Sequence, residues 1–221
     1  MSPSARLVVF DLDGTLIDSE QDLILSVNAA RRSLGLDDLA GHLIASYVGN
    51  GAPVLLRRAL GPDAPESDVR KALDFFLNYY REHMLDHTTL YPGVRDTLDE
   101  LQAAGVSMAV LTNKPVRFSQ AIVDGLGLQG HFQRVFGGNS FAEKKPHPVG
   151  IDTLLSELDL RREDTIMVGD SDVDILTARN AGVRSCGVTY GFKPESLKET
   201  PPDHLIDRMP DLLPIVLPAR R

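Results

Sequence analysis

The sequence predicts an α/β fold in which a doubly wound, Rossmann-like parallel sheet carries an inserted helical domain. Short, uninterrupted apolar runs recur along the chain, as is typical of strands that are buried on both faces of a parallel sheet. Segments with helical periodicity separate these runs. One long segment, residues 18–90, has several helical patterns and no strand pattern. We therefore expect a sheet with one helical insertion after its first strand.

The alternation of strand and helix patterns can be followed along the chain. The predicted strands are residues 7–10, 107–111, 165–168 and 185–188, with weaker patterns at 134–136 and 204–206. Between them, helical patterns end at a glycine, which favours helix termination: residues 94–104 before Gly105, 121–126 before Gly127 and 172–181 before Gly182. Strand and helix in repeated alternation indicate a parallel sheet.

The insertion is predicted to be a small helical bundle. A helix should begin near Ser19, where Asp22 three residues later resembles a capping box, and it should end before Gly35. Further helices are expected over residues 54–60 and 69–84, separated by a Gly-Pro-Asp turn. We assign residues 18–90 to this cap domain and residues 1–17 and 91–221 to the core. The expected hinges are residues 17–19 and 87–93.

Composition and charge limit the functional classes. Hydrophobic residues at 43% and charged residues at 24% are typical of a globular protein, and we expect a monomer or a homodimer. No segment matches a membrane span or a signal peptide, so we expect a cytoplasmic protein without a membrane partner. The net charge of −8, with no basic block, argues against nucleic acid. The single cysteine, Cys186, excludes an intrachain disulfide.

Polar residues follow the predicted strands, at the sheet edge where α/β proteins bind ligands. Asp11 and Asp13 follow the first strand, Thr112 and Asn113 the second, and Asp170, Asp172 and Asp174 the third of the stronger strand patterns. Lys144 and Lys145 lie between these segments in the sequence. Several carboxylates at one edge require a cation, and Mg²⁺ with a phosphate is the usual arrangement. We therefore expect a small anionic phosphorylated metabolite as the ligand.

The first two aspartates suggest a reaction. The Asp11 carboxylate could attack phosphorus and form an acyl phosphate, which divides one displacement into two easier steps. Asp13 could protonate the leaving oxygen and later activate water. For this role its pKa must rise by roughly three units from about 3.9, and neighbouring carboxylates act in that direction.

These motifs resemble the four ordered motifs of the haloacid dehalogenase superfamily: Asp11-Leu-Asp13-Gly-Thr, then Thr112, then Lys145 before Pro146, then Gly169-Asp170-Ser171 with Asp174. The resemblance covers nearly the whole chain and includes a helical cap after the first strand. Within the superfamily, the segments around Gly49, Gly93, Asn113, His147 and Asp172 are most similar to bacterial phosphoglycolate phosphatases. The resemblance implies a Mg²⁺-dependent phosphomonoester hydrolase with 2-phosphoglycolate as its substrate.

The resemblance also implies a role for each matching residue. Asp11 would be the nucleophile and Asp13 the acid/base, while Lys145 would orient Asp11; Lys144 is the competing lysine. The implied Mg²⁺ ligands are the Asp11 carboxylate, the Asp13 carbonyl and Asp170, with Asp174 in support. Thr112 and the Asn113 backbone would bind phosphoryl oxygens.

Cap residues are candidates for substrate binding. The loop containing Asn50 and Gly51 is expected to face the substrate, and either Arg57 or Arg58 could bind a substrate carboxylate. The aromatic residues of the cap, including Phe76 and Tyr80, have the spacing of helix packing.

Three alternatives remain at this point. The first comprises other reactions of the same superfamily: phosphatases for other small metabolites, inorganic pyrophosphatase and β-phosphoglucomutase. The second is a phospho-accepting signalling module similar to a response-regulator receiver, which Asp13 and the helical insertion disfavour. The third is a catalytically silent binding protein on this fold.

Overall fold

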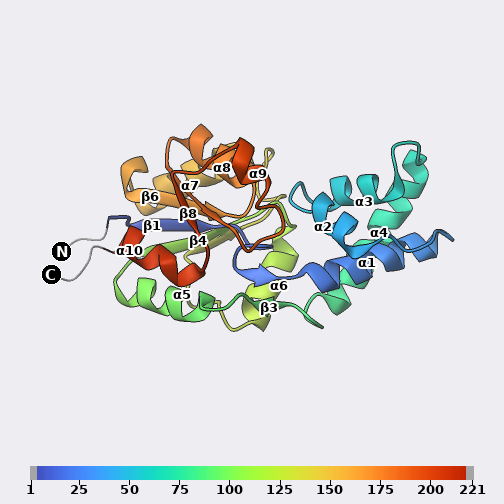
Figure 1. The fold of residues 1–221 in the computed structure, drawn as a ribbon, viewed down its shortest axis with the longest axis horizontal. Coiled ribbons are helices and arrows are strands. Elements are labelled where there is room, and N and C mark those ends of the chain that lie inside the picture. Colours follow the sequence, from blue (N-terminus) through green and yellow to red (C-terminus); the bar gives the residue numbers. More distant parts are fainter. Residues whose placement is uncertain (1–3, 218–221) are drawn as a thin grey trace.

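The computed structural model describes residues 4–217, which form a parallel sheet covered by helices on both faces and a helical region beside one end of the sheet (Figure 1). The sheet has six strands in the order β5-β4-β1-β6-β7-β8. Their bounds are β1 Leu7–Phe10, β4 Ser107–Leu111, β5 Arg134–Phe136, β6 Thr165–Gly169, β7 Arg184–Val188 and β8 His204–Ile206. All neighbouring pairs are parallel. The predicted α/β fold and all six predicted strands are confirmed.

The two faces of the sheet are buried by different helices because side chains alternate along each strand. Leu7 and Val9 of β1 pack with Ile151 and Ala178, which belong to α7 (Val149–Leu158) and α8 (Asp172–Ala181). Val8 and Phe10 pack into a second core that includes side chains of α5 (Val94–Ala103), α6 (Val116–Gly125) and the C-terminal segments. These segments are the 3₁₀ helix η2 (Met209–Leu212) and α10 (Leu213–Val216). The short helix α9 (Ser196–Glu199) contacts α8 instead, and the 3₁₀ helix η1 (Arg162–Asp164) precedes β6. Burial of both faces explains the continuous apolar runs.

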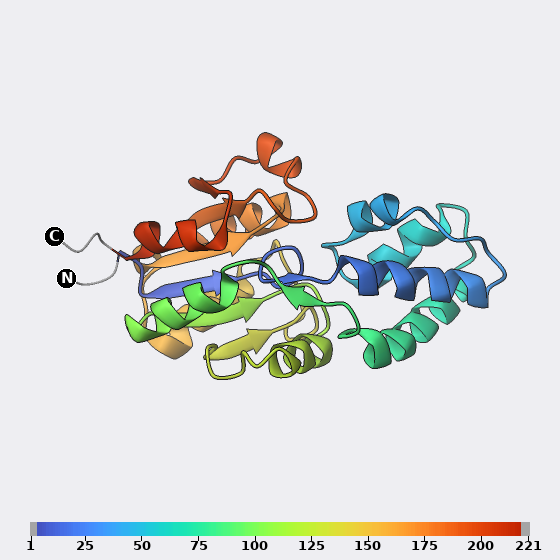
Figure 2. The same ribbon diagram turned by 60° about the horizontal axis from the view of Figure 1, so that its bottom comes forward.

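The helical region lies between β1 and β4 in the chain. It consists of α1 (Glu20–Ser33), α2 (Gly41–Tyr47), α3 (Ala52–Leu60) and α4 (Glu66–His83). Val27, Leu56, Ala72 and Phe76 are buried among these helices. Figure 2 shows this region extending beyond the end of the sheet, with two chain segments connecting it to the core.

The two connecting segments pair with each other. β2 (Ile17–Asp18) and β3 (Thr89–Leu90) form a two-stranded antiparallel ribbon with Ile17 opposite Leu90. Asp22, one turn into α1, accepts hydrogen bonds from the backbone N–H groups of His87 and Thr88 at 2.9–3.1 Å and from the Thr88 hydroxyl at 2.8 Å. The His87 ring nitrogen Nδ1 also lies 2.8 Å from Asp22. The first helix therefore holds the returning segment directly.

The capping box predicted at the start of α1 is wrong. Ser19 makes no side-chain capping bond; its hydroxyl donates instead to Oδ1 of Asp13 at 2.5 Å. The Asp22 carboxylate is occupied by residues 87 and 88. Both side chains that the sequence pattern assigned to the helix terminus therefore form hydrogen bonds with residues outside the helix. A capping box does form at Ser171 and Asp174, at the start of α8.

Candidate active site

Strand register brings the predicted site segments after β1, β4 and β6 to the same edge of the sheet. Phe10 is level with Val110 of β4 and Val168 of β6, so the chain leaves all three strands at one edge of the sheet. The Asp11 N–H donates to the Val168 carbonyl at 2.9 Å, which fixes the start of the loop after β1. β1 lies between β4 and β6, so the chain crosses to the other side of β1 between these strands. This edge is the switch point at which α/β sheets bind ligands.

Three carboxylates and one lysine meet at this edge. One oxygen each from Asp11, Asp170 and Asp174 lie within 4.8 Å of one another, and all three residues are buried. The ammonium of Lys145 lies 2.8 Å from Oδ1 of Asp11 and 2.7 Å from Oδ1 of Asp174. Burial alone would lower the pKa of Lys145, but the two carboxylates raise it, so the lysine remains charged. Lys144 is exposed and instead donates to the Asn50 carbonyl at 2.8 Å.

The carboxylate cluster fits a hard divalent cation. Burial, together with the neighbouring carboxylates, raises the pKa of both Asp11 and Asp170, because one ammonium does not balance three acids. Oδ1 of Asp11 is buried and, apart from its ion pair with the Lys145 ammonium, has no hydrogen-bond partner among residues 4–217. A bound cation would use this oxygen and relieve the repulsion. Carboxylate oxygens are the ligands that Mg²⁺ and Ca²⁺ prefer, so the donor set fits either ion.

Asp170 and Asp174 are held in different ways. Oδ2 of Asp170 accepts a hydrogen bond from the Phe192 N–H at 2.7 Å. Oδ2 of Asp174 accepts from the Ser171 N–H at 3.1 Å and the Ser171 hydroxyl at 2.8 Å, while its Oδ1 contacts Lys145. Asp174 therefore has partners on both oxygens.

The residue after Asp13 is Gly14, and its backbone conformation and surroundings exclude a side chain. It has a φ of +80°, which side chains rarely adopt, and a Cβ there would lie 2.5 Å from Oδ2 of Asp170. The loop after β1 can approach the Asp170 carboxylate this closely only without a side chain at this position.

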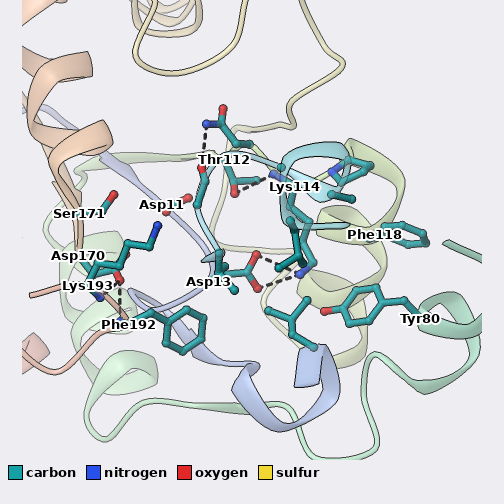
Figure 3. Close-up of a pocket in the computed structure, with 18 of the residues that line it drawn as sticks. Asp11, Asp13, Tyr80, Thr112, Lys114, Phe118, Asp170, Ser171, Phe192 and Lys193 are labelled. Atoms are coloured by element: carbon teal, nitrogen blue, oxygen red, sulfur yellow. Dashed lines mark hydrogen bonds and ion pairs between the residues drawn. The ribbon is translucent and has the colours of Figure 1, made fainter. Parts of the chain in front are cut away.

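Asp13 contacts a second lysine, Lys114. The Lys114 ammonium lies 2.8 and 3.0 Å from the two Asp13 oxygens (Figure 3). Both side chains are nearly buried, with 5% of Lys114 and 11% of Asp13 exposed. The same ammonium lies 4.6 Å from the centre of the Tyr80 ring, which belongs to α4 of the helical region. Sequence reasoning missed Lys114, although it lies in the Leu-Thr-Asn-Lys-Pro segment that carried the resemblance.

The residues after β4 contact the helical region. Thr112 and Asn113 are buried and line the pocket. The Asn113 side-chain amide donates to the carbonyls of Gly49 at 3.0 Å and Lys145 at 3.1 Å. Gly51 also lines the pocket, whereas Asn50 is not among the lining residues and its carbonyl accepts a hydrogen bond from Lys144.

The expectation that Arg57 binds substrate is not supported. Its guanidinium donates to the Ala64 carbonyl at 2.9 Å and forms an ion pair with Glu66, both within the helical region. Arg58 reaches the Tyr47 carbonyl at 3.4 Å. Arg57 is placed on its helix by these local partners, away from the pocket.

The pocket has two chemically different walls. Its lining on the sheet side is polar and includes Asp11, Asp13, Thr112 and Asp170. The cap contributes a largely apolar wall that includes Leu23, Leu55, Phe76 and Tyr80. Lys193, from the loop that holds Asp170, also lines the pocket and was missed from the sequence.

The chain was compared with known proteins. A model of the haloacid dehalogenase-like hydrolases matches residues 8–188, which span the sheet edge and the helical region. The chain belongs to the haloacid dehalogenase-like hydrolases. A phosphoglycolate phosphatase of Vibrio parahaemolyticus is 40% identical over 220 residues, covering 96% of each chain, and that of Vibrio cholerae is 40% identical over 223 residues, covering 97% of this chain and 98% of the relative.

A solved structure has nearly the same fold as this chain. A protein of Haemophilus somnus, described as a "predicted phosphoglycolate phosphatase", superimposes with a TM-score of 0.92 at 35% identity, covering 96% of this chain and 98% of that one. The similarity includes the helical region inserted after β1. Among residues 4–217, no helix is both long and apolar enough to span a membrane.

Proposed function

We propose that this haloacid dehalogenase-like hydrolase is a Mg²⁺-dependent phosphatase that converts 2-phosphoglycolate to glycolate and phosphate. The observation that carries the proposal is the pair of aspartates after β1, one beside a buried carboxylate cluster and the other beside the apolar cap wall. Full-length similarity to proteins named phosphoglycolate phosphatase supports this choice of substrate.

In the first proposed step, a carboxylate oxygen of Asp11 attacks phosphorus and the bond from phosphorus to the glycolate oxygen breaks. Asp13 gives its proton to that oxygen, so glycolate leaves as an alcohol. Lys145, 2.8 Å from Asp11, holds the nucleophile in position. Thr112 and the Asn113 backbone bind phosphoryl oxygens. The product of this step is an acyl phosphate on Asp11.

In the second proposed step, water attacks the phosphorus of the acyl phosphate and Asp13 takes up a proton from that water. The bond between phosphorus and Asp11 breaks, which releases phosphate and restores the carboxylate. Asp11, the Asp13 carbonyl and Asp170 would hold Mg²⁺, with Asp174 supporting the site through Lys145 and Ser171. The ion would neutralise phosphoryl charge and align the phosphate with Asp11.

Residues 18–90 are proposed to act as a cap that closes over the core, residues 1–17 and 91–221. Two core side chains, Asn113 and Lys144, donate to carbonyls of the cap loop at 3.0 and 2.8 Å. These bonds would form on closure and exclude water from the acyl phosphate. The ribbon of β2 and β3 is the proposed hinge.

Phosphate release from a substrate panel tests the proposal. The panel contains 2-phosphoglycolate, sugar phosphates, nucleotides and pyrophosphate, each with Mg²⁺ and with a chelator, for the parent protein and Asp11→Asn. We expect the highest kcat/KM for 2-phosphoglycolate, and loss of activity on chelation and in the variant. A higher kcat/KM for pyrophosphate, or isomerisation of β-glucose 1-phosphate, would instead assign one of the related reactions.

A further inference from the structure

Lys114 lines the pocket and has no role in the proposed phosphoryl transfer. Lys145 already contacts Asp11 and Asp174. Lys114 is almost as deeply buried as Lys145, with 7% of the residue exposed, yet it contacts neither carboxylate and lies beside Asp13. Burying an ammonium is costly unless an anion or hydrogen-bonding groups surround it. Asp13 supplies one such anion, and the ammonium therefore lies on the leaving-group side of the site with a donor left for a further partner.

A polar group next to Lys114, the Tyr80 hydroxyl, forms no hydrogen bond of good geometry within the described residues. Tyr80 is 1% exposed and lines the pocket, and its hydroxyl has no hydrogen-bond partner in the described part of the chain. Its ring is fixed by stacking on Phe76 at 5.4 Å and by an edge contact with Phe118 at 5.5 Å. Figure 3 shows the Tyr80 hydroxyl directed toward Lys114 and Asp13. Burial raises the pKa of Tyr80 to about 12, so the hydroxyl stays protonated and able to donate at neutral pH.

We propose that Lys114 and Tyr80 form a carboxylate subsite that selects substrates bearing a carboxylate one carbon away from the phosphoester oxygen. The inference rests on the proposed function and names the residues that would confer its specificity. Neither residue is a predicted phosphate or metal ligand. Lys114 comes from the core and Tyr80 from the cap helix α4, so the subsite would be complete only when the cap covers the core.

Geometry places this subsite at the correct distance along the substrate. Asp13 must contact the leaving oxygen in order to protonate it, and the Lys114 ammonium lies 2.8–3.0 Å from the Asp13 oxygens. In 2-phosphoglycolate the carboxylate carbon is two bonds from the leaving oxygen. An ammonium has three donors, so Lys114 can bond a substrate carboxylate while it still contacts Asp13.

Charge favours a carboxylate over a second phosphate. While Asp13 carries the proton that it gives to the leaving oxygen, the subsite offers one ammonium and one neutral hydroxyl, which match a single negative charge. Around them, Leu23, Phe76 and Phe118 line the pocket with apolar surface. In this water-poor environment a dianionic phosphate would keep an uncompensated charge. An uncharged alkyl group would leave the Lys114 donor and the Tyr80 hydroxyl without the partner that a carboxylate provides.

The test compares kcat/KM for 2-phosphoglycolate with kcat/KM for ethyl phosphate, which has the same chain length and no carboxylate. Lys114→Met should lower this selectivity ratio by about 10- to 150-fold, as expected for loss of a hydrogen bond between charged groups. Tyr80→Phe should lower it by about 2- to 12-fold, the effect of losing a neutral donor. The ratio isolates carboxylate recognition, because any general effect of the substitutions on Asp13 or on folding lowers both rates.

Two control variants match these changes away from the pocket. Tyr79→Phe removes a hydroxyl from the adjacent residue of α4, and Lys71→Met removes an ammonium that is exposed and contacts Asp68. Both should keep the parent selectivity ratio. Inhibition by inorganic phosphate, measured in every variant, should stay at the parent value and so report an intact phosphate site.

The outcomes separate this inference from the proposed function. If the parent prefers 2-phosphoglycolate and Lys114→Met retains the full ratio, the carboxylate subsite is wrong and the proposed function stands. If the parent shows no preference for 2-phosphoglycolate over ethyl phosphate, the proposed substrate is wrong and the subsite with it. A reduced ratio in both variants, with unchanged controls, supports the subsite.

Discussion

Replacing Lys145 by methionine should destabilise the metal-free protein strongly. The Lys145 side chain is 2% exposed and its ammonium lies 2.7–2.8 Å from Asp174 and Asp11. Methionine fills much of the same space but leaves three buried carboxylates facing one another without this ammonium. Removal of one partner from a buried ion pair costs about 3–5 kcal/mol. At roughly 2–4 °C per kcal/mol for a chain of this size, Tm in the presence of a chelator should fall by about 6–20 °C.

Mg²⁺ should restore more stability to Lys145→Met than it adds to the parent. The cation would supply the positive charge that the variant lacks, so its affinity should rise although turnover is lost. A ligand at 100 times its Kd stabilises a protein by about 2.7 kcal/mol. Thermal unfolding followed by circular dichroism, with chelator and with a Mg²⁺ series, measures both effects.

Lys144→Met is the matched control for this experiment. Lys144 is the next residue in the chain and is exposed, with a bond to the Asn50 carbonyl. Its replacement should change stability by less than about 0.5 kcal/mol. The electrostatic reasoning is refuted if Lys145→Met melts with the parent in chelator, or if the variant gains less stability from Mg²⁺ than the parent does.

Two further substitutions test the hinge and the loop after β1. Asp22→Asn should destabilise the protein by about 1–3 kcal/mol at pH 7, because the amide presents a donor to buried N–H groups. Burial would raise the pKa of Asp22, but hydrogen bonds from Thr88 and His87 lower it overall. The charged form therefore stabilises the folded state above the ordinary pKa of about 3.8, and this contribution is lost as the pH falls below it. Urea unfolding at pH 7 and pH 3.5 should show the difference between variant and parent shrinking in acid, and a constant difference would contradict this account. Gly14→Ala should weaken Mg²⁺ binding, measured by calorimetric titration, because its Cβ would displace Asp170; unchanged affinity would show that the loop can move without loss.

Much of the sheet could be predicted from the sequence because its signal is local. Each strand is buried on both faces, so its residues are apolar without interruption, as Leu7–Phe10 is. Because parallel strands all run in the same direction, the residues that follow them lie at the same edge of the sheet. For this reason the sequence alone predicts that Asp11, Thr112 and Asp170 lie at one edge of the sheet.

Other elements were missed for identifiable reasons. β2 and β3 have two residues each and exist only because they pair across more than 70 positions of sequence. α2 has a single buried residue, Ile44, and so has almost no apolar pattern. α7 is different: Ile151, Leu154 and Leu155 have helical spacing and are buried, so its pattern could have been recognised.

Site residues that depend on long-range contacts had no local signal. A lysine after Thr-Asn and a tyrosine on an amphipathic helix are ordinary residues in sequence, and only folding brings Lys114 within 4.6 Å of the Tyr80 ring. The misassigned capping box has the same origin, since Ser19 bonds to Asp13 rather than to its own helix. Arg57 is a candidate from sequence because it is cationic, but in the structure its guanidinium forms an ion pair with Glu66 within the helical region.

The proposed phosphoryl transfer and the proposed substrate selection use residues from different parts of the structure. The three carboxylates follow the adjacent strands β1 and β6, and Lys145, from the loop before α7, contacts two of them. Substitutions in the helical region can therefore change the apolar wall without moving the groups proposed to act on phosphorus. Recognition of the leaving group instead needs Tyr80 from α4 above Lys114 from the core. Chemistry would then require only the core, while substrate choice would require the closed arrangement. A poor substrate that cannot bridge Lys114 and Tyr80 would fail because it does not stabilise closure, even though its phosphate binds normally.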